Sequence, residues 1–457
     1  MNFSLPLHPN QKELVMNSFR TYFFLLLTLF LLACGKDRTY EYEEKTQHNH
    51  WIREQMLDQY LWADSLVDFE PAWKDFFSDP AAFLATLSKK SRADDYWSYV
   101  EVDTIVADAH ARGYFNHLNS YGFDFILMKD PTGQTTRQML RVATVYPGSP
   151  AERAGLLRGD YICSYDGYKF TSSNIKRMQT GGARTLEVRH MAVDEEEGFY
   201  YWEDTVTVKM GASEYVEDVA FPTSSVLLAD GRKVGYLMCT RLVEWPVEQK
   251  QRGSSPVYRD ALSGIMQQMK QVGVDEMVLD LRLCNFGTME MAQQLASSVV
   301  SPDALHSTFV QTFWNERYTS NNQSIPYDTS VPNLGLSRVY VLIGNYTQGA
   351  AEWLIHALQH SMGEENVITI GSLTAGQNVM TQQVGYDYFV HLCPVVAYVA
   401  DGDGNYDYDQ IEPMIEVPEF SYLNLGEYGT EEEVLLYTAL QHILGLIVPD
   451  VDEEEEE

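Results

Sequence analysis

The sequence has few basic residues, few cysteines and no apolar run long enough to span a bilayer as a helix. Its 457 residues include 32 lysines and arginines against 65 aspartates and glutamates, which gives a formal net charge of −33. A chain this acidic has no broad electrostatic attraction for nucleic acid or for an anionic membrane surface. The charge balance therefore excludes nucleic acid as an expected partner, and any membrane attachment needs another cause.

Lysine is absent from the whole C-terminal part of the chain. After Lys270, residues 271–457 hold 29 acidic residues and three arginines, a net charge of −26. Chemistry that needs a lysine as general base is therefore excluded from this part. The apolar content of 45% and the aromatic content of 12% nevertheless predict buried cores, divided between two or three domains.

The five cysteines are too dispersed to indicate a metal site. Apart from Cys34 they lie far apart and form no CxxC pair; they are Cys163, Cys239, Cys284 and Cys393. Neither a zinc site nor a disulfide framework is indicated, and we expect no metal and no cofactor. Most of them lie in apolar, strand-like runs, where cysteine behaves as a small buried hydrophobe, although a disulfide bridge stays open in an oxidising compartment.

An apolar run of about a dozen residues, Tyr22–Ala33, follows Arg20 near the N-terminus. It is too short for a mature spanning helix. Its end, Leu31–Cys34, resembles the lipobox of bacterial lipoproteins, which implies a signal peptide over residues 1–33 and acylation of Cys34. An ordinary secretory signal with a chance cysteine is the alternative, and the start codon is Met1 or Met16.

Either interpretation of this run predicts export. The lipoprotein resemblance implies a cell-envelope location, in the outer membrane and facing the periplasm or the cell surface, with acyl chains as the anchor. Residues 34–49 are then expected to be a solvated tether. At the other end, the acidic tail 451–457 is expected to be disordered.

Residues 50–115 are predicted to form a small helical region. Trp51, Ile52, Met56 and Tyr60 recur at helical spacing, and Asp79-Pro80 before an apolar run predicts a helix start.

Residues 116–212 carry the pattern of a PDZ domain. A strand-like run, Leu140–Tyr146, leads into Pro147–Gly155, and Asp166-Gly167 supplies a tight turn. These segments resemble PDZ domains of bacterial proteases, which add an extended peptide to a sheet edge and receive its C-terminal carboxylate in a loop. That loop's place is taken by Gly122, Phe123, Asp124 and Phe125. The Asp124 charge opposes carboxylate capture, so a purely structural PDZ domain stays open.

From residue 213 to 450 the chain alternates strand-like and helical runs, as an α/β layered core does. The predicted strands are 233–239, 276–281, 337–343 and 367–370, and the predicted helices are 259–271, 289–300 and 350–360. This part resembles the tail-specific, or C-terminal-processing, serine peptidases in several ordered segments: Gly235–Leu237, Val278–Arg282, Val341–Glu352, Ile370–Gln377 and Ile411–Pro413. The resemblance implies a layered core of the crotonase/ClpP type, preceded by the β-rich PDZ domain and a small N-terminal helical cap.

The resemblance also implies that the catalytic residues are missing. The position of the nucleophilic serine holds Gly349, the position of the general-base lysine holds Gln377, and the position of a supporting glutamine holds Thr381. Because no lysine follows Lys270, no shift of the alignment restores a Ser–Lys dyad. Backbone amides at Gly287 and Ala350 are the candidates for the oxyanion hole.

Other residues in this part of the chain suggest other chemistries. Glu352, His356 and His360 share one predicted helix face at a spacing that suits a metal ion, but simple packing is the favoured interpretation. Asp401–Asp409 resembles a calcium loop only in part, so a solvated turn is expected. The candidates for a displaced nucleophile are Cys284, Thr347 and Ser372. None of them has a general base that can be identified from the sequence.

The sequence therefore predicts a membrane-anchored, inactive homologue of these peptidases that binds peptides or protein C-termini. Two alternatives stay open. One is an active serine-type endopeptidase with a displaced nucleophile, and the other is a structural subunit of an envelope complex.

Overall fold

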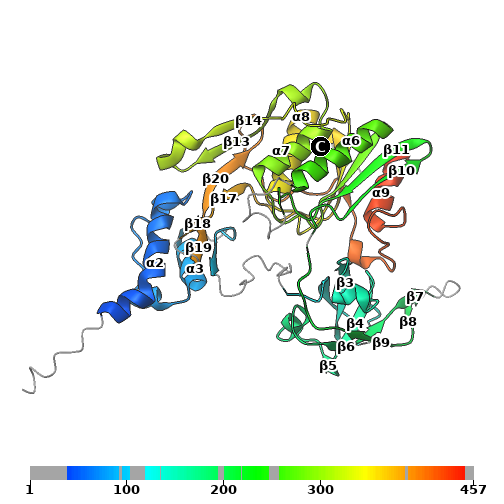
Figure 1. Cartoon of the computed structure of the whole chain (residues 1–457), viewed down its shortest axis with the longest axis horizontal. Coiled ribbons are helices and arrows are strands. Elements are labelled where there is room, and N and C mark those ends of the chain that lie inside the picture. Colours follow the sequence, from blue (N-terminus) through cyan, green and yellow to red (C-terminus); the bar gives the residue numbers. More distant parts are fainter. Residues whose placement is uncertain are drawn as a thin grey trace, which may run out of the picture.

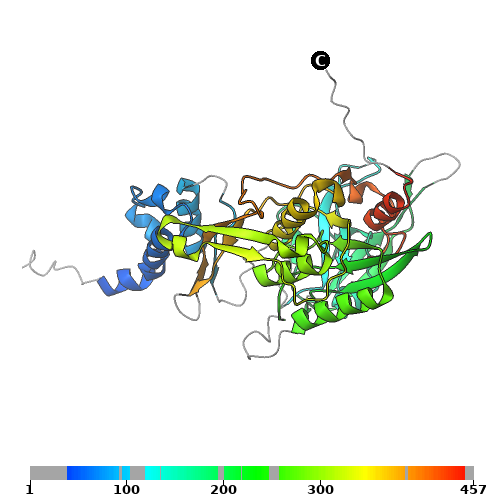
Figure 2. The same ribbon diagram turned by 90° about the horizontal axis from the view of Figure 1, so that it is seen from above.

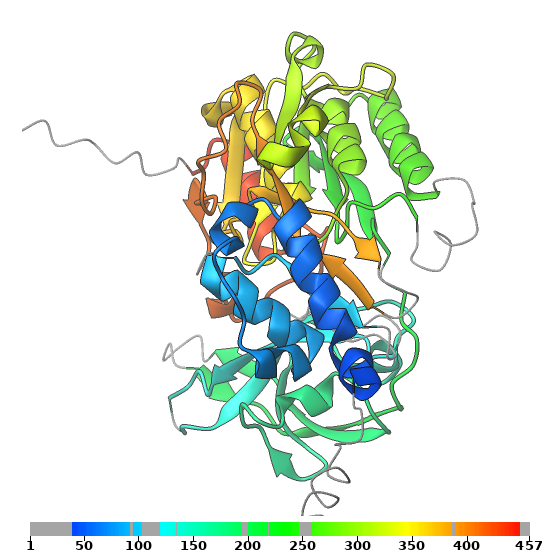
Figure 3. The same ribbon diagram turned by 90° about the vertical axis from the view of Figure 1, so that its left-hand side faces the viewer.

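The computed structural model describes residues 39–91, 95–102, 119–133, 135–193, 200–217, 219–245, 257–385 and 390–447. The predicted signal peptide 1–33, Cys34 and the tail 451–457 lie outside these residues. The described chain has three parts: a helical cap, a β-rich domain and an α/β core (Figure 1). Seen from the cap side, the core lies above and the β-rich domain below (Figure 3). None of the described helices has the length and hydropathy of a membrane-spanning segment.

The helical cap consists of two helices, two short 3-10 turns and one strand. They are α2 (Thr39–Gln59), η1 (Ala63–Leu66), η2 (Trp73–Phe77), α3 (Pro80–Ser91) and β1 (Tyr99–Val102). Ile52, Met56 and Tyr60 are fully buried between these elements, as their spacing predicts. Asp79 accepts a hydrogen bond from the amide of Ala81 and so begins α3.

The helix α2 begins at Thr39, which lies inside the segment expected to be a tether. Tertiary contacts explain the difference: Asn49 is buried and its side-chain amide donates to the carbonyls of Phe76 and Ser78. Residues 39–49 are therefore part of the folded cap, and a solvated tether is shorter than the sequence suggested.

The β-rich domain contains an antiparallel sheet in the order β2-β3-β4-β6-β9, with β2 at one edge. Its elements are β2 (Phe123–Lys129), β3 (Gln138–Val145), α4 (Pro150–Arg153), β4 (Tyr161–Tyr165), β5 (Tyr168–Lys169), η3 (Ile175–Met178), β6 (Arg184–Arg189), β7 (Met191–Val193), β8 (Tyr200–Trp202) and β9 (Val206–Met210). Ser149 caps α4 by accepting from the amide of Glu152. Asp166 and Gly167 form the tight turn between β4 and β5, both with positive φ.

The core is built on a six-stranded sheet in the order β10-β11-β12-β15-β16-β21. The strands are β10 (Thr223–Ala229), β11 (Arg232–Met238), β12 (Glu276–Asp280), β15 (Val339–Ile343), β16 (Val367–Gly371) and β21 (Ile415–Glu416). All neighbours from β11 onward are parallel. The four predicted strands therefore form the centre of one sheet, which puts their carboxyl ends at a common edge.

Helices cover both faces of this sheet, as a parallel sheet requires (Figure 1). One apolar cluster includes residues of α6 (Val257–Val272), α7 (Met289–Val299) and α8 (Ala350–Met362). A second, with α9 (Val434–Ile443), packs on the other side of the sheet. Short 3-10 turns lie at η4 (Ala304–His306), η6 (Glu364–Asn366) and η7 (Glu419–Ser421).

A β-arm joins the core to the cap, and the sequence did not predict it. It contains β13 (Thr308–Trp314), η5 (Glu316–Asn321), β14 (Gln323–Pro326), β17 (Val379–Thr381), β18 (Val384–Gly385), β19 (Val390–Cys393) and β20 (Val395–Ala400). β1 of the cap pairs with β19, and Trp62 donates to the hydroxyl of Tyr398. Figure 2 shows the β13–β14 hairpin extending from the core toward the cap helices.

Buried arginines fasten the β-rich domain to the core. Arg141 of β3 is 1% exposed and donates to the carbonyls of Phe420 and Tyr422. Arg158 contacts Glu419 and Glu433 of the core, and Arg282 contacts the same two carboxylates.

We call the set Arg158, Arg282, Glu419, Glu433 and Asp280 the arginine network. Arg282 also pairs with Asp280, which accepts from the hydroxyl of Tyr236. Because Asp280 ends β12, the network connects the β-rich domain to the edge of the sheet at which the parallel strands end.

Candidate peptide-binding site

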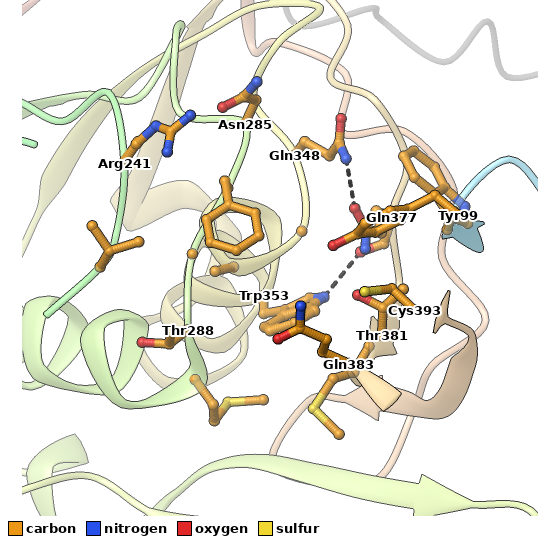
Figure 4. A pocket seen from close by; sticks show the side chains of 18 of the residues that line it. Tyr99, Arg241, Asn285, Thr288, Gln348, Trp353, Gln377, Thr381, Gln383 and Cys393 are labelled. Atoms are coloured by element: carbon orange, nitrogen blue, oxygen red, sulfur yellow. Dashed lines mark hydrogen bonds between the residues drawn. The ribbon is translucent and has the colours of Figure 1, made fainter. Parts of the chain in front are cut away.

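A pocket of about 780 Å³ opens where the parallel strands of the core end. Its walls are the segments after β11 and β12, the start of α8, the chain around β17, and the cap strand β1 with the residues before it (Figure 4). Clefts beyond the carboxyl ends of parallel strands are the usual ligand sites of α/β sheets. Among the described residues, this pocket is the place where the motif positions predicted from the sequence meet.

Gly349 lies on a sharp turn between β15 and α8. Its φ of 57° and ψ of −113° fall in a region that favours glycine. Thr347 holds the turn by donating to the carbonyl of Leu281 and accepting from the amide of Gly344. A strand, a strained turn and a helix in this order form the backbone on which hydrolases present a nucleophile. Here the backbone has that form, and the residue on it carries no side chain.

Gln377 lies directly beside Gly349. A Cβ atom placed on Gly349 would be 3.1 Å from Oε1 of Gln377. That oxygen accepts from Nε2 of Gln348 at 2.8 Å (Figure 4). Nε2 of Gln377 donates to the carbonyl of Val379 at 3.0 Å. Trp353 donates to the backbone carbonyl of Gln377. The two motif positions are therefore adjacent, and the Gln377 amide is held at both ends.

The Glu352 carboxylate connects the two motif segments, because it accepts hydrogen bonds from backbone amides of both. Glu352 is 1% exposed, and its carboxylate accepts from the amides of Gly349, Gly376 and Gln377 and from the hydroxyl of Thr374. Burial raises the pKa of Glu352, and these hydrogen bonds oppose the rise. The Glu352 carboxylate therefore fixes the spacing between Gly349 and Gln377.

The two oxyanion-hole candidates lie together beside Gly349. A Cβ atom on Gly287 would be 2.7 Å from the Cβ of Ala350 and 2.7 Å from that of Leu242. Only glycine permits this close approach. Phe286, where the peptidase pattern has a second glycine, is 40% exposed and lines the pocket. Thr381, the third motif position, lines the same pocket.

The displaced nucleophiles weighed from the sequence are not presented to this pocket. Cys284 and Thr347 are fully buried, and neither they nor Ser372 are among its described lining residues. The lining thiol is that of Cys393, whose pKa burial raises to about 12, so it is protonated at neutral pH. The lining hydroxyls are those of Tyr96, Tyr99, Thr288 and Thr381, and serine, lysine and histidine are absent from the described lining residues.

The helix face weighed as a metal site is used for packing. Glu352 is bound by the amides named above, and the ring of His356 lies 3.6 Å from that of Tyr408. Burial lowers the pKa of His356 to about 4, so the imidazole is neutral at pH 7. His360 contacts Asp401, whose carboxylate also accepts from amides of its own turn. No group of three or more His, Cys, Asp or Glu side chains in the described residues is arranged around a metal position.

The predicted peptide loop of the β-rich domain lies at the start of the edge strand β2. Phe123 is 2% exposed and packs in the domain core, so its side chain does not face a ligand. The carbonyl of Gly122 accepts from the amide of Tyr146 and the hydroxyl of Ser149. Phe125 packs against Phe123 at 5.6 Å between ring centroids. Asp124 and Phe125 are the partly exposed residues of this loop, and β2 lies at the edge of the sheet.

Asp124 interacts with tyrosines of both the β-rich domain and the core. It accepts from the hydroxyl of Tyr146 at 3.0 Å. Burial raises the pKa of Tyr346, and the Asp124 carboxylate raises it further. Tyr346 belongs to the turn that leads to Gly349, so the start of β2 lies close to the segment that shapes the pocket.

Sequence reasoning missed several residues of the pocket. Arg241 follows β11 at the carboxyl edge of the sheet, a position that could have singled it out. Tyr99 and Glu101 reach the pocket only because β1 pairs with β19, and no local pattern reveals that pairing.

The fold and the pocket define an α/β peptidase-type core that carries a PDZ domain. Residues 233–417 match the model of Peptidase family S41, and residues 141–177 match a PDZ domain model. Residues 233–417 therefore form a domain of peptidase family S41, the tail-specific proteases, as the sequence motifs predicted. The α/β fold class with a PDZ domain is likewise confirmed.

A solved structure agrees with this assignment. A crystal structure of a Bacteroides fragilis protein assigned to the S41 proteases shares 29% identity over 87% of this chain and 98% of its own, with a TM-score of 0.75. A photosystem II D1 C-terminal processing protease shares 16% identity over 82% and 93% of the two chains, with a TM-score of 0.48, which supports no conclusion about this chain. A search of curated proteins returned no match.

Proposed function

We propose that this chain is a non-catalytic member of the S41 family that binds extended peptide segments or protein C-termini. The observation that carries the proposal is the pair Gly349 and Gln377, which lie side by side in an open pocket whose described lining residues include no serine, lysine or histidine. A glycine supplies no nucleophile, and an amide does not accept a proton at neutral pH.

Two features support peptide binding, and neither depends on a serine at position 349 or a lysine at position 377. The pocket has a volume of about 780 Å³ and is lined by tryptophan, tyrosine and phenylalanine side chains. The edge strand β2 of the PDZ domain offers a second place for an extended peptide, by β-strand addition. The proposed function is therefore that the protein binds unfolded polypeptide and does not hydrolyse it.

The test combines binding with turnover. Fluorescent peptides of about fifteen residues should bind the folded protein with micromolar dissociation constants in fluorescence anisotropy. The same peptides and an unfolded casein should stay intact after a day, and a fluorophosphonate probe should leave the protein unlabelled. Labelling together with accumulating cleavage products would instead establish an active enzyme with a displaced nucleophile. Intact protein that binds no peptide would favour a structural subunit.

We further propose that acyl chains on Cys34 hold the protein at a bacterial membrane of the cell envelope. The support is the short apolar run that ends in the lipobox-like Leu31–Cys34. The Cys34→Ser variant is expected to move from the membrane fraction to the soluble fraction and to lose incorporation of a labelled fatty acid. Cys163→Ser is the matched control and should stay at the membrane. A Cys34→Ser variant that remains membrane-bound would contradict the anchor.

A further inference from the structure

The charged side chains of the pocket are unequal in number. Among the residues that the structure describes, three carboxylates line it, those of Glu101, Glu244 and Glu290, against one guanidinium, that of Arg241. No described lining residue is a lysine. The described lining residues therefore carry an excess of negative charge, and a cleft strengthens the effect of such a charge on a ligand.

Two of these carboxylates are held in place. Glu244 accepts from the hydroxyl of Thr288 at 2.9 Å, and Glu101 accepts from Nε2 of Gln383 at 3.3 Å. Thr288 and Gln383 lie toward the bottom of the pocket in Figure 4, and Arg241 lies toward its top. Each of these two carboxylates therefore has its place in the pocket wall set by a hydrogen bond to a neighbouring lining residue.

Aromatic side chains line the same pocket as the carboxylates. Tyr96 is 69% exposed and Phe286 is 40% exposed, and Trp97 and Trp245 are half-buried in the same lining. The Arg241 guanidinium lies over the Phe286 ring, 5.9 Å from its centroid. This cation–π contact is an example, within the pocket, of how a cationic side chain packs on these rings. Exposed rings next to carboxylates bind the apolar stem and the cationic head of lysine or arginine at once.

We propose that the pocket selects extended polypeptide segments that carry lysine or arginine next to apolar residues. The inference rests on the proposed binding function and names its ligand class. The charge complementarity points to a cationic segment, and the volume of the pocket suits several residues of an extended chain.

The test uses three fluorescent peptides that differ only at two central positions, which hold lysine, glutamine or glutamate. Both peptide ends are blocked, so capture of a free C-terminus by the PDZ domain contributes nothing. At low salt, the lysine peptide is expected to bind about tenfold more tightly than the glutamine peptide, and the glutamate peptide most weakly. The lysine advantage should shrink as salt is raised, because salt screens the attraction.

A triple variant locates the effect. Glu101→Gln with Glu244→Gln and Glu290→Gln keeps an acceptor at each position but removes the charge. It should abolish the lysine preference, so that the lysine and glutamine peptides bind this variant with dissociation constants within about twofold of each other. The matched control changes Glu364, Glu365 and Glu431, which are exposed and outside the described lining, to glutamine. The control should keep the full preference.

The outcomes separate this inference from the proposed function. Equal binding of all three peptides, or a preference that survives in the triple variant, would refute the charge selection and leave peptide binding intact. Failure of every peptide to bind the folded protein would refute both.

Discussion

Serine at position 349 together with lysine at position 377 is expected to give the protein measurable peptidase activity, whereas neither single change does. A side chain on residue 349 would begin 3.1 Å from the Gln377 side chain, so Gly349→Ser and Gln377→Lys place a hydroxyl and an amine together. Burial beside Trp353 would lower the pKa of the introduced lysine and favour its neutral form. A positioned general base contributes about 10²-fold or more.

The activity is measured as release of fluorescence from labelled casein, with fluorophosphonate labelling of the introduced serine as the second readout. Gly349→Ala with Gln377→Lys is the matched control, because alanine suffers the same strain of about 1–3 kcal/mol at positive φ but has no hydroxyl. A folded Ser–Lys variant with no turnover would show that the oxyanion position, altered at Phe286, is also lost. Residues other than 349 and 377 would then also be responsible for the lack of peptidase activity.

Replacement of Arg282 by methionine is expected to destabilise the protein by about 3–5 kcal/mol, because it leaves buried carboxylates without their partner. Arg282 is 3% exposed, and its partners Asp280 and Glu433 are fully buried. Differential scanning calorimetry should show a Tm roughly 10 °C lower. Arg317→Met is the matched control: Arg317 and its partner Asp58 are exposed, so the change should cost less than about 1 kcal/mol.

The effect of Arg282→Met should depend on pH in a defined direction. Burial opposes ionisation of Glu433, but the Arg282 and Arg158 charges prevail and lower its pKa below the usual 4.5. A depressed folded-state pKa contributes stability above pH 4.5 that is lost as the pH falls through the folded value. The Tm difference between the two proteins should therefore be largest near neutrality and shrink below pH 4.5. A difference that grows on acidification would contradict this role of the ion pairs.

The sequence predicted the core sheet well because its strands are local, apolar and bounded by turns. The predicted runs at 276–281 and 367–370 correspond to β12 (Glu276–Asp280) and β16 (Val367–Gly371). The meeting of Gly349 with Gln377 was also predictable, because both follow strands that end at the same edge of a parallel sheet. Family motifs added the chemical identity of those positions, which periodicity alone does not supply.

Features that depend on distant parts of the chain were not predictable. The extra turns of α2 before residue 50 depend on Asn49 reaching the carbonyl of Phe76, a contact without a local signal. The arginine network joins Arg158, Arg282 and Glu433, which lie in three separate segments of the sequence. Electrostatic partners of this kind follow from the packing of domains and appear in no periodic pattern.

The pairing of β1 with β19 sets the order in which the molecule can be completed. Tyr99 is opposite Cys393 in that pairing, and both line the pocket. A contact between residues so far apart in sequence forms late and slowly, because the loop between its strands must first be ordered. During synthesis, β1 of the cap therefore stays unpaired until β19, in the last quarter of the chain, has been made. The pocket is therefore complete only after β19 has paired with β1, and a product truncated before β19 would leave the edge of β1 open.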